Sequence, residues 1–126
     1  MESTGSNLFR TDTVMFEYDV HDMQRTVQWY QDMFGFEIIF GPTDCHTEFS
    51  LPLKGARLAL SLADETVRIQ KGSRLFLATR DIQSAEAYLK AKGARTKPIE
   101  NVDNVVLVLW VEDPEGNYLA VEQRLI

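Results

Sequence analysis

Side chains that could take part in chemistry gather around residue 46. His46 and Glu48 stand two residues apart, and this spacing places both on one face of a strand because side chains alternate across it. A metal site or a deaminase site could use such a pair. No Cys-x-x-Cys accompanies it, however, and the only other histidine is His21. We therefore expect His46 and Glu48 to contact a ligand through hydrogen bonds.

Cys45 precedes His46 directly, so on a strand the two side chains point to opposite faces and cannot form a thiolate–imidazole pair with each other. We expect no nucleophilic role for this thiol. A single cysteine also excludes an internal disulfide and is typical of a reducing compartment.

Composition excludes several classes of protein. The net charge of −6 argues against nucleic-acid binding, which needs a basic patch. No stretch approaches the roughly 18 apolar residues of a membrane span, and the first residues lack the basic-then-apolar order of a signal peptide. The sequence predicts a cytoplasmic protein without nucleic-acid or membrane partners.

A capped helix followed by a strand occurs twice in the chain. Asp22 precedes an apolar series with helical spacing that ends at Gly35, and Asp81 precedes a second such series that ends at Gly93. The pattern predicts helices at about 23–34 and 82–92. The near-constant offset between the two copies indicates an internal repeat.

The remaining pattern predicts four strands in each half. Alternation, β-branched residues and turn signals place them at 14–20, 36–40, 46–53 and 56–63, and again at 74–79, 94–99, 105–111 and 118–124. Pro98 indicates an edge strand, and residues 101–104 and 113–117 read as turns. We expect a disordered tail at 1–11, a polar loop at 64–72, and one domain over 12–126 with repeats at 12–70 and 73–126.

Each half alone would expose one face of its sheet and one face of its helix. Packed together, the halves can curve their strands around a shared cleft and cover the outside with helices. The predicted fold class is therefore α+β, with two βαβββ modules forming a curved eight-stranded mixed sheet around a cleft.

Two motifs resemble a known family. Residues 22–37, DMQRTVQWYQDMFGFE, resemble the helix of the vicinal oxygen chelate superfamily, with Phe34 where its members have leucine, and residues 112–117, EDPEGN, are similar to the turn before their last strand. This superfamily includes glyoxalases, bleomycin-resistance proteins and extradiol dioxygenases. The resemblance implies the glyoxalase/bleomycin resistance fold and a homodimer whose cleft is built across two chains. One fold hosts many chemistries, so it does not fix the activity.

The resemblance also implies four metal-ligand positions, one on each of four cleft-lining strands. Counted from the motifs, they fall on Met15, Ala59, Leu75 and Ala120. None of these side chains suits a hard or borderline divalent ion, since a methionine thioether binds at most Cu(I). A one-residue slip would rescue one position at best, because it also turns the side chain to the opposite face. We therefore expect no metal, no other cofactor and no catalytic residue.

Alternation extends these positions into a predicted cleft wall. Glu17 and Glu122 could line it or lie solvated at strand ends, Arg57 could be an ion-pair partner for one of them, and Trp110 could be a stacking wall or part of the core. The predicted ligand-binding residues are Met15, Glu17, His46, Glu48, Arg57, Ala59, Leu75, Trp110, Tyr118, Ala120 and Glu122.

Two functional classes stay open, with an accessory domain as a third if side chains fill the cleft. The first is a small-molecule-binding protein that sequesters its ligand, as bleomycin-resistance proteins do, and the second is a metal-dependent glyoxalase, lyase or dioxygenase-type enzyme. The absent ligand side chains favour the first. The acidic excess of the wall further predicts a preference for organic cations or neutral aromatic amides.

Overall fold

The computed structural model describes Leu8 and residues 12–63 and 74–126. The predicted tail, apart from Leu8, and the predicted loop at 64–72 lie outside these residues. The first half contains β1 (Val14–Val20), α2 (Met23–Phe34), β2 (Glu37–Phe40), β3 (His46–Ser50) and β4 (Ala56–Leu62). The second contains β5 (Phe76–Ala78), α3 (Ile82–Ala91), β6 (Arg95–Thr96), β7 (Glu100–Val102), β8 (Val106–Glu112) and β9 (Tyr118–Arg124).

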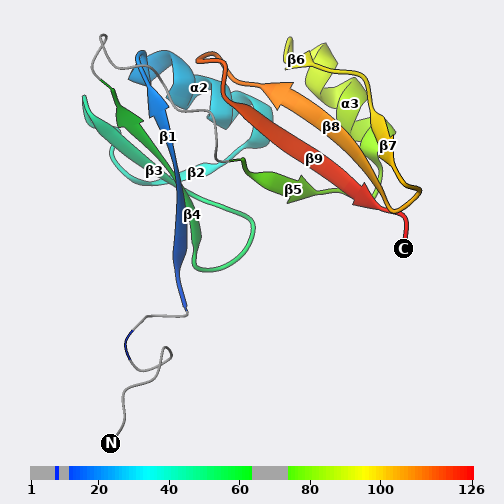
Figure 1. Ribbon diagram of the computed structural model, residues 1–126. Coiled ribbons are helices and arrows are strands. Elements are labelled where there is room, and N and C mark those ends of the chain that lie inside the picture. Colours follow the sequence, from blue (N-terminus) through cyan, green and yellow to red (C-terminus); the bar gives the residue numbers. More distant parts are fainter. Residues whose placement is uncertain (1–7, 9–11, 64–73) are drawn as a thin grey trace, which may run out of the picture.

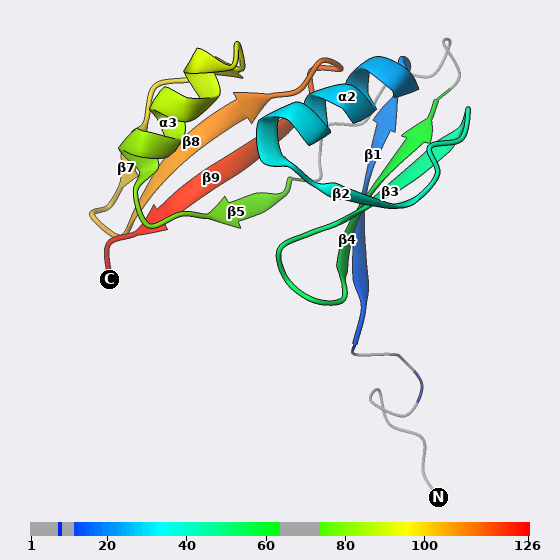
Figure 2. The same cartoon turned by 180° about the vertical axis from the view of Figure 1, so that it is seen from behind.

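The two halves share one topology. The first forms a four-stranded sheet in the order β1-β4-β3-β2, and the second a five-stranded sheet in the order β5-β9-β8-β6, with β7 also paired to β8. In each half the first strand is parallel to the last, and such a pair needs a long crossover, in which the helix lies. Both helices lie on the same side of the sheets (Figures 1 and 2). The prediction of two βαβββ modules is confirmed, with the strands divided between two sheets.

Local signals position both helices. The side chain of Asp22 accepts a hydrogen bond from the N–H of Arg25, and that of Asp81 accepts one from the N–H of Ser84, so each Asp is an N-cap. Gly35 ends α2 with a φ of 66°, and its N–H donates to the carbonyl of Gln31. The helices observed over 23–34 and 82–91 agree with the prediction to within one residue.

Proline and a two-residue turn shape the far edge of the second sheet. The predicted strand at 94–99 is instead two short strands, β6 and β7, separated by a segment that contains Pro98. Asp103 and Asn104 have φ values of 54° and 57°, and they connect β7 to β8 in a tight hairpin. Residues 101 and 102, predicted as part of a turn, therefore belong to β7.

One hydrophobic core draws side chains from both halves. Tyr30 of α2 is fully buried and packs near Phe36 and Phe49, with ring centroids 6.3 and 6.0 Å away. Ile82 and Leu89 of α3 are buried in the same cluster. The core therefore lies between the helices and the sheets, and it leaves the opposite face of each sheet uncovered by helix.

The turn at 113–117 surrounds a buried carboxylate. Asp113 Oδ1 accepts hydrogen bonds from the N–H groups of Glu115 and Asn117, at 2.9 and 2.8 Å. Asp113 Oδ2 accepts from the Tyr30 hydroxyl at 2.9 Å and from Asn117 Nδ2 at 3.1 Å. Burial raises the pKa of the Asp113 carboxyl above its ordinary value, although these hydrogen bonds act in the opposite direction. Burial and the neighbouring Asp113 charge raise the pKa of Tyr30 well above its ordinary value.

The same turn joins the second half to the first. Glu115 Oε1 accepts hydrogen bonds from the backbone N–H groups of His21 and Asp22, at 2.8 and 2.6 Å, where α2 begins. Asn117 Nδ2 donates to the carbonyl of Asp19 at 3.3 Å. The polar residues of this motif thus hold α2 and β1 against the β8–β9 turn. No helix within the described residues has the length and apolar character needed to cross a membrane.

Candidate functional site

The face of each sheet opposite the helices, called the open face here, carries most of the predicted site. On β1, Tyr18 and Val20 point into the core, so Met15 and Glu17 point the other way. Strand pairing places Glu17, Ala59 and Glu48 in one cross-strand row. The equivalent cross-strand row in the second sheet consists of Phe76, Ala120 and Trp110.

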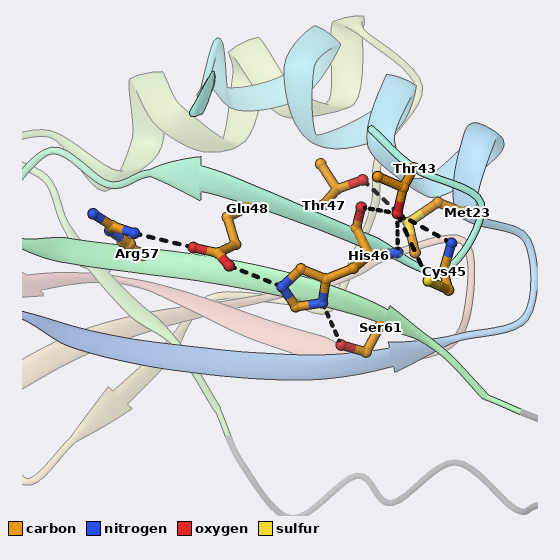
Figure 3. Close-up of polar contacts among 8 residues, drawn as sticks. All are labelled: Met23, Thr43, Cys45, His46, Thr47, Glu48, Arg57 and Ser61. Carbon is orange, nitrogen blue, oxygen red and sulfur yellow. Dashed lines mark hydrogen bonds and ion pairs between the residues drawn. The ribbon is translucent and has the colours of Figure 1, made fainter. Parts of the chain in front are cut away.

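A chain of polar contacts crosses the open face of the first sheet (Figure 3). Glu48 Oε1 accepts a hydrogen bond from Arg57 Nη1 at 3.1 Å, and Glu48 Oε2 lies 2.9 Å from His46 Nε2. The other ring nitrogen, His46 Nδ1, lies 2.9 Å from Ser61 Oγ. His46 and Glu48 therefore share a face, as their spacing predicts, and the contact with Ser61 extends the pair.

When the His46 ring is neutral, the ionised Glu48 carboxylate fixes the direction of each hydrogen bond. The His46 hydrogen bond, followed by the one from Arg57, lowers the pKa of the Glu48 carboxyl below its ordinary value, so this group is ionised and can only accept. A neutral His46 ring therefore donates from Nε2 and keeps a lone pair on Nδ1. Ser61 then donates its hydroxyl proton to Nδ1, and the hydroxyl oxygen retains a free lone pair.

The Cys45 thiol belongs to a separate set of contacts. Its Sγ lies 3.8 Å from Thr43 Oγ1, whereas the His46 ring contacts Glu48 and Ser61 (Figure 3). Thr43 Oγ1 accepts a hydrogen bond from the N–H of His46 at 3.0 Å. The thiol and the imidazole do not form a pair, as the alternation argument predicts.

Arg57 has a partner different from the expected one. Its guanidinium pairs with Glu48, at 3.1 Å, and not with Glu17 or Glu122. Glu122 lies 3.6 Å from Arg124, and Glu17 is exposed. The expectation of an ion pair with Glu17 or Glu122 is therefore wrong: Glu17 and Glu48 both lie opposite Ala59, on either side of β4, and the Arg57 side chain pairs with the one on β3.

The open face of the second sheet is aromatic. The rings of Phe76 and Trp110 meet edge to face, with centroids 5.6 Å apart, and Arg74 lies over the Trp110 ring at 5.0 Å. Lys97 Nζ lies 4.6 Å from the centroid of the Tyr118 ring. The chain's own cations thus lie over the ring faces of Trp110 and Tyr118. Trp110 is half-buried in this wall and does not belong to the core cluster.

Leu75 does not face the cleft, so its predicted place in the site is wrong. Only 4% of its surface is exposed and it belongs to the core cluster, whereas its neighbour Phe76 pairs with Ala120 on the open face. Counting back from Asp81 gives a register that is wrong by one residue. Such a slip exchanges the two faces of a strand.

The two predicted alanines lie on the open face but do not reach its surface. Ala59 and Ala120 both have an exposed fraction of 0%. Each is a methyl side chain between longer neighbours, so a ligand could touch it only after those neighbours move. Met15, in contrast, is 48% exposed.

The residues at the implied metal positions do not fit a metal ion. Met15 lies opposite Arg57 across the β1–β4 pair, and Ala120 lies opposite Phe76 across β5–β9. A guanidinium beside the first position repels a cation, and the other side chains offer no hard donor. Within residues 12–63 and 74–126, no group of three or more His, Cys, Asp or Glu side chains is arranged to hold a metal.

Three of the hollows among the described residues adjoin the helices, away from the predicted site. One of about 500 Å³ lies beside Trp29, Arg95 and Pro114, and one of about 440 Å³ lies between α2 and the turn at Pro42. A third, of about 220 Å³, is apolar and lies between Phe34 and Tyr88. None of the predicted ligand-binding residues lines any of the three.

Sequence reasoning did not predict the contacts of three further residues. Alternation with Arg57 and Ala59 places Ser61 on the predicted cleft wall, but its contact with His46 follows only from the β3–β4 register. Arg74 and Lys97 lie in predicted strands but outside the observed β5 and β6, and they reach their rings through long side chains. No pattern in the sequence indicates these two contacts.

Comparison with known proteins gives a consistent assignment. Residues 15–121 match the family model described as a glyoxalase-like domain. Among curated proteins, none matches this sequence.

Solved structures share the fold at low identity. An integron cassette protein, HFX_CASS4, from the mobile metagenome of the Halifax Harbour sewage outfall is 15% identical, with a TM-score of 0.76 over 90% of this chain and 98% of that one. TnmS3, described as an antibiotic-binding protein from Streptomyces sp. CB03234, is 21% identical, with a TM-score of 0.73 over 89% and 94%. A member of the glyoxalase/bleomycin resistance protein/dioxygenase superfamily from Sphaerobacter thermophilus DSM 20745 is 24% identical, with a TM-score of 0.72 over 89% and 96%.

Proposed function

This chain belongs to the glyoxalase-like domain family of the vicinal oxygen chelate superfamily, and we propose that it binds a planar aromatic small molecule on its open faces without metal chemistry. Two copies of the chain would enclose the ligand between them. The protein would act by sequestration rather than by turnover of that ligand.

The observation that carries this proposal is that apolar and aromatic side chains, rather than metal donors, lie at or beside the implied metal positions. Where the superfamily resemblance implies ligands, the chain has Met15 beside Arg57 and Ala120 beside Phe76. Trp110 and Phe76 supply ring surfaces, and offset or edge-to-face contacts with a ligand ring would contribute about 0.5–1.5 kcal/mol beyond area burial. A few polar groups, Glu48 and His46 among them, could orient the ligand.

The cations over the rings bear on the charge of the ligand. Arg74 over Trp110 and Lys97 over Tyr118 reduce the attraction of these ring faces for a further cation. A neutral or anionic planar aromatic should therefore be preferred on the second sheet. This preference differs from the one that the acidic residues alone predict. The description of TnmS3 as antibiotic-binding supports the general class, although it applies to that protein.

Thermal-shift measurements with 2-naphthoate, naphthalene-2-carboxamide and 9-aminoacridine test the proposal. We expect the anion and the amide to raise the unfolding midpoint more than the cation does, and Trp110→Leu to remove this effect. Tyr88→Leu is the matched control, because Tyr88 is also an aromatic residue with a cation, Lys92, over its ring, but lies on α3. Stabilisation by the cation alone would contradict the proposed ligand class.

Metal analysis of the desalted protein separates this proposal from the enzymatic alternative. We expect far less than one equivalent of nickel, zinc, iron or manganese per chain. A near-unit content would favour the metal-dependent glyoxalase, lyase or dioxygenase-type function instead.

A further inference from the structure

The polar chain on the first sheet has the parts of a nucleophilic site. We propose that Ser61 is a nucleophile toward activated acyl compounds such as aryl esters, with His46 as its general base and Glu48 as a positioning residue. This activity goes beyond ligand binding and does not depend on it.

The geometry meets the requirements for an activated serine. Ser61 Oγ lies 2.9 Å from His46 Nδ1, within reach for proton transfer, and His46 Nε2 lies 2.9 Å from Glu48 Oε2. Ser61 is the cross-strand partner of His46, and Glu48 stands two residues further along the same strand. All three side chains therefore share the open face. An arrangement of this kind is recognised by geometry and roles, whatever the fold or chain order.

Arg57 and Glu48 together hold His46 in the tautomer that a general base needs here, with the ring proton on Nε2. The guanidinium binds one carboxylate oxygen, so the other oxygen is directed to the Nε2–H of the imidazole. The lone pair of Nδ1 is then left for the serine proton (Figure 3). The base is also reachable, since the His46 side chain is 26% exposed and that of Glu48 is 17% exposed.

Nearby backbone groups limit the substrate class. The N–H groups of Leu62 and Ala63 donate to the carbonyls of Cys45 and Val20, so neither is available to stabilise an oxyanion beside Ser61. Each missing oxyanion donor costs about 10²–10³ in rate. Esters with a good leaving group, such as a nitrophenolate, tolerate this loss better than amides do.

The reaction balances without any further reactant except water. Ser61 Oγ bonds to the carbonyl carbon of the aryl ester while its proton passes to His46 Nδ1. The bond to the aryl oxygen breaks, and the aryloxide leaves with that proton. Water then attacks the acyl carbon, its proton passes to His46, and the serine oxygen leaves and recovers that proton.

Labelling of the wild-type protein with diisopropyl fluorophosphate tests the nucleophile directly. The Ser61 oxygen would bond to phosphorus as fluoride leaves, giving an adduct that peptide mass spectrometry can locate. We expect modification at Ser61. Modification only at other residues, or none, would overturn the proposal, and this experiment needs no variant that could fail to fold.

Variants then assign the roles, using release of p-nitrophenol from p-nitrophenyl acetate. The assays use a Cys45→Ala background because the exposed thiol could react with the ester itself. Ser61→Ala should abolish acylation, and His46→Gln should slow it about 10²-fold or more. Ser50→Ala is the matched control, since Ser50 lies on the same face but its hydroxyl donates to the carbonyl of Leu51. Equal rates with and without Ser61→Ala in the Cys45→Ala background would also overturn the proposal.

Glu48→Gln tests positioning through the histidine tautomer. Arg57 would hold the amide oxygen, so the amide N–H₂ would face His46 Nε2 and move the ring proton to Nδ1. Acylation should fall, and the ¹⁵N chemical shifts of the ring nitrogens should change to the Nδ1–H pattern, which is readable because the chain has only two histidines. A loss of stability alone would not produce this spectral change, and an unchanged tautomer would contradict the role assigned to Glu48.

Discussion

Arg57 illustrates how a single residue changes the chemistry of the open face. It lies opposite Met15, one of the implied metal positions, and its guanidinium pairs with Glu48. The guanidinium thus provides a fixed positive charge without an open coordination position. Its pairing also orients the carboxylate that sets the His46 tautomer, so the same residue that disfavours a metal beside Met15 supports hydrogen-bond chemistry.

At the same scale, Tyr30→Phe should destabilise the protein. The substitution removes one of the donors to the buried Asp113 carboxyl and leaves the ring packing in place. A lost hydrogen bond to a buried, charged acceptor costs about 1.5–3 kcal/mol in the free energy of unfolding. Urea denaturation measures this change, and Tyr88→Phe, which alters an exposed ring on α3, should change it by less than about 0.5 kcal/mol. Equal stability of Tyr30→Phe and wild type would show that Asp113 does not need this donor.

The lowered pKa of Glu48 predicts a pH dependence of stability. A carboxyl group whose pKa is lower in the folded than in the unfolded state stabilises the fold above the unfolded value, about 4.3 for Glu. This contribution is lost as the pH falls through the folded value. Unfolding measured from pH 6 downward should therefore show a shallower acid-side loss of stability in Glu48→Gln than in wild type. His46→Asn should show a similar change, because the hydrogen bond to His46 makes the largest contribution to the lowered pKa of Glu48. An identical loss of stability with falling pH in variants and wild type would contradict this prediction.

At the scale of elements, the sequence predicts what local interactions determine. Both helices follow from an Asp cap and a closing Gly within the same dozen residues, and β1 and β9 have the predicted bounds. β5 is the informative failure, because three paired residues give too short an alternation to fix its register, and only its pairing with β9 does so. Likewise, the shared face of His46 and Glu48 was predictable from their spacing within one strand. The contact of His46 with Ser61 was not, because it joins residues 15 positions apart on two strands.

Gly55, in the turn between β3 and β4, should tolerate substitution by alanine less well than Gly35, at the end of α2. Gly55 has a φ of +84°, and a Cβ added there would collide with the backbone carbonyl of Asp12, whereas Gly35 has a φ of +66° and open space around it. Gly35→Ala should cost about 1–2 kcal/mol, the penalty of a left-handed conformation alone. Gly55→Ala should cost clearly more, because the start of β1 must also move. Denaturant unfolding of both variants checks the order, and a smaller effect at Gly55 would contradict it.

At the scale of the whole molecule, the uncovered faces predict a homodimer. Met15, Phe40 and Phe76 are each about half exposed on the side of the sheets that carries no helix (Figures 1 and 2). A second copy packed there would remove apolar surface from water and enclose the proposed ligand site. Light scattering at micromolar concentration should give twice the chain mass of 14.4 kDa.

The matched variants for this prediction are Phe76→Asp and Tyr88→Asp. We expect Phe76→Asp to dissociate the dimer, because it places a charge in the proposed interface. Tyr88→Asp changes an aromatic of similar exposure on α3 and should leave the mass unchanged. A monomeric wild type would rule out the two-chain cleft.

The parallel pairing of the first and last strands in each half also has a consequence for biosynthesis. β4 completes the first sheet at residue 62, but β5 has no partner until β9, which begins at residue 118. During translation, at about 5–20 residues per second, the first half can therefore close several seconds before the second. In that interval Phe76 and the apolar side of α3 would be exposed in the nascent chain. We infer that this protein depends most on the ribosome surface or on chaperones while its second half is emerging.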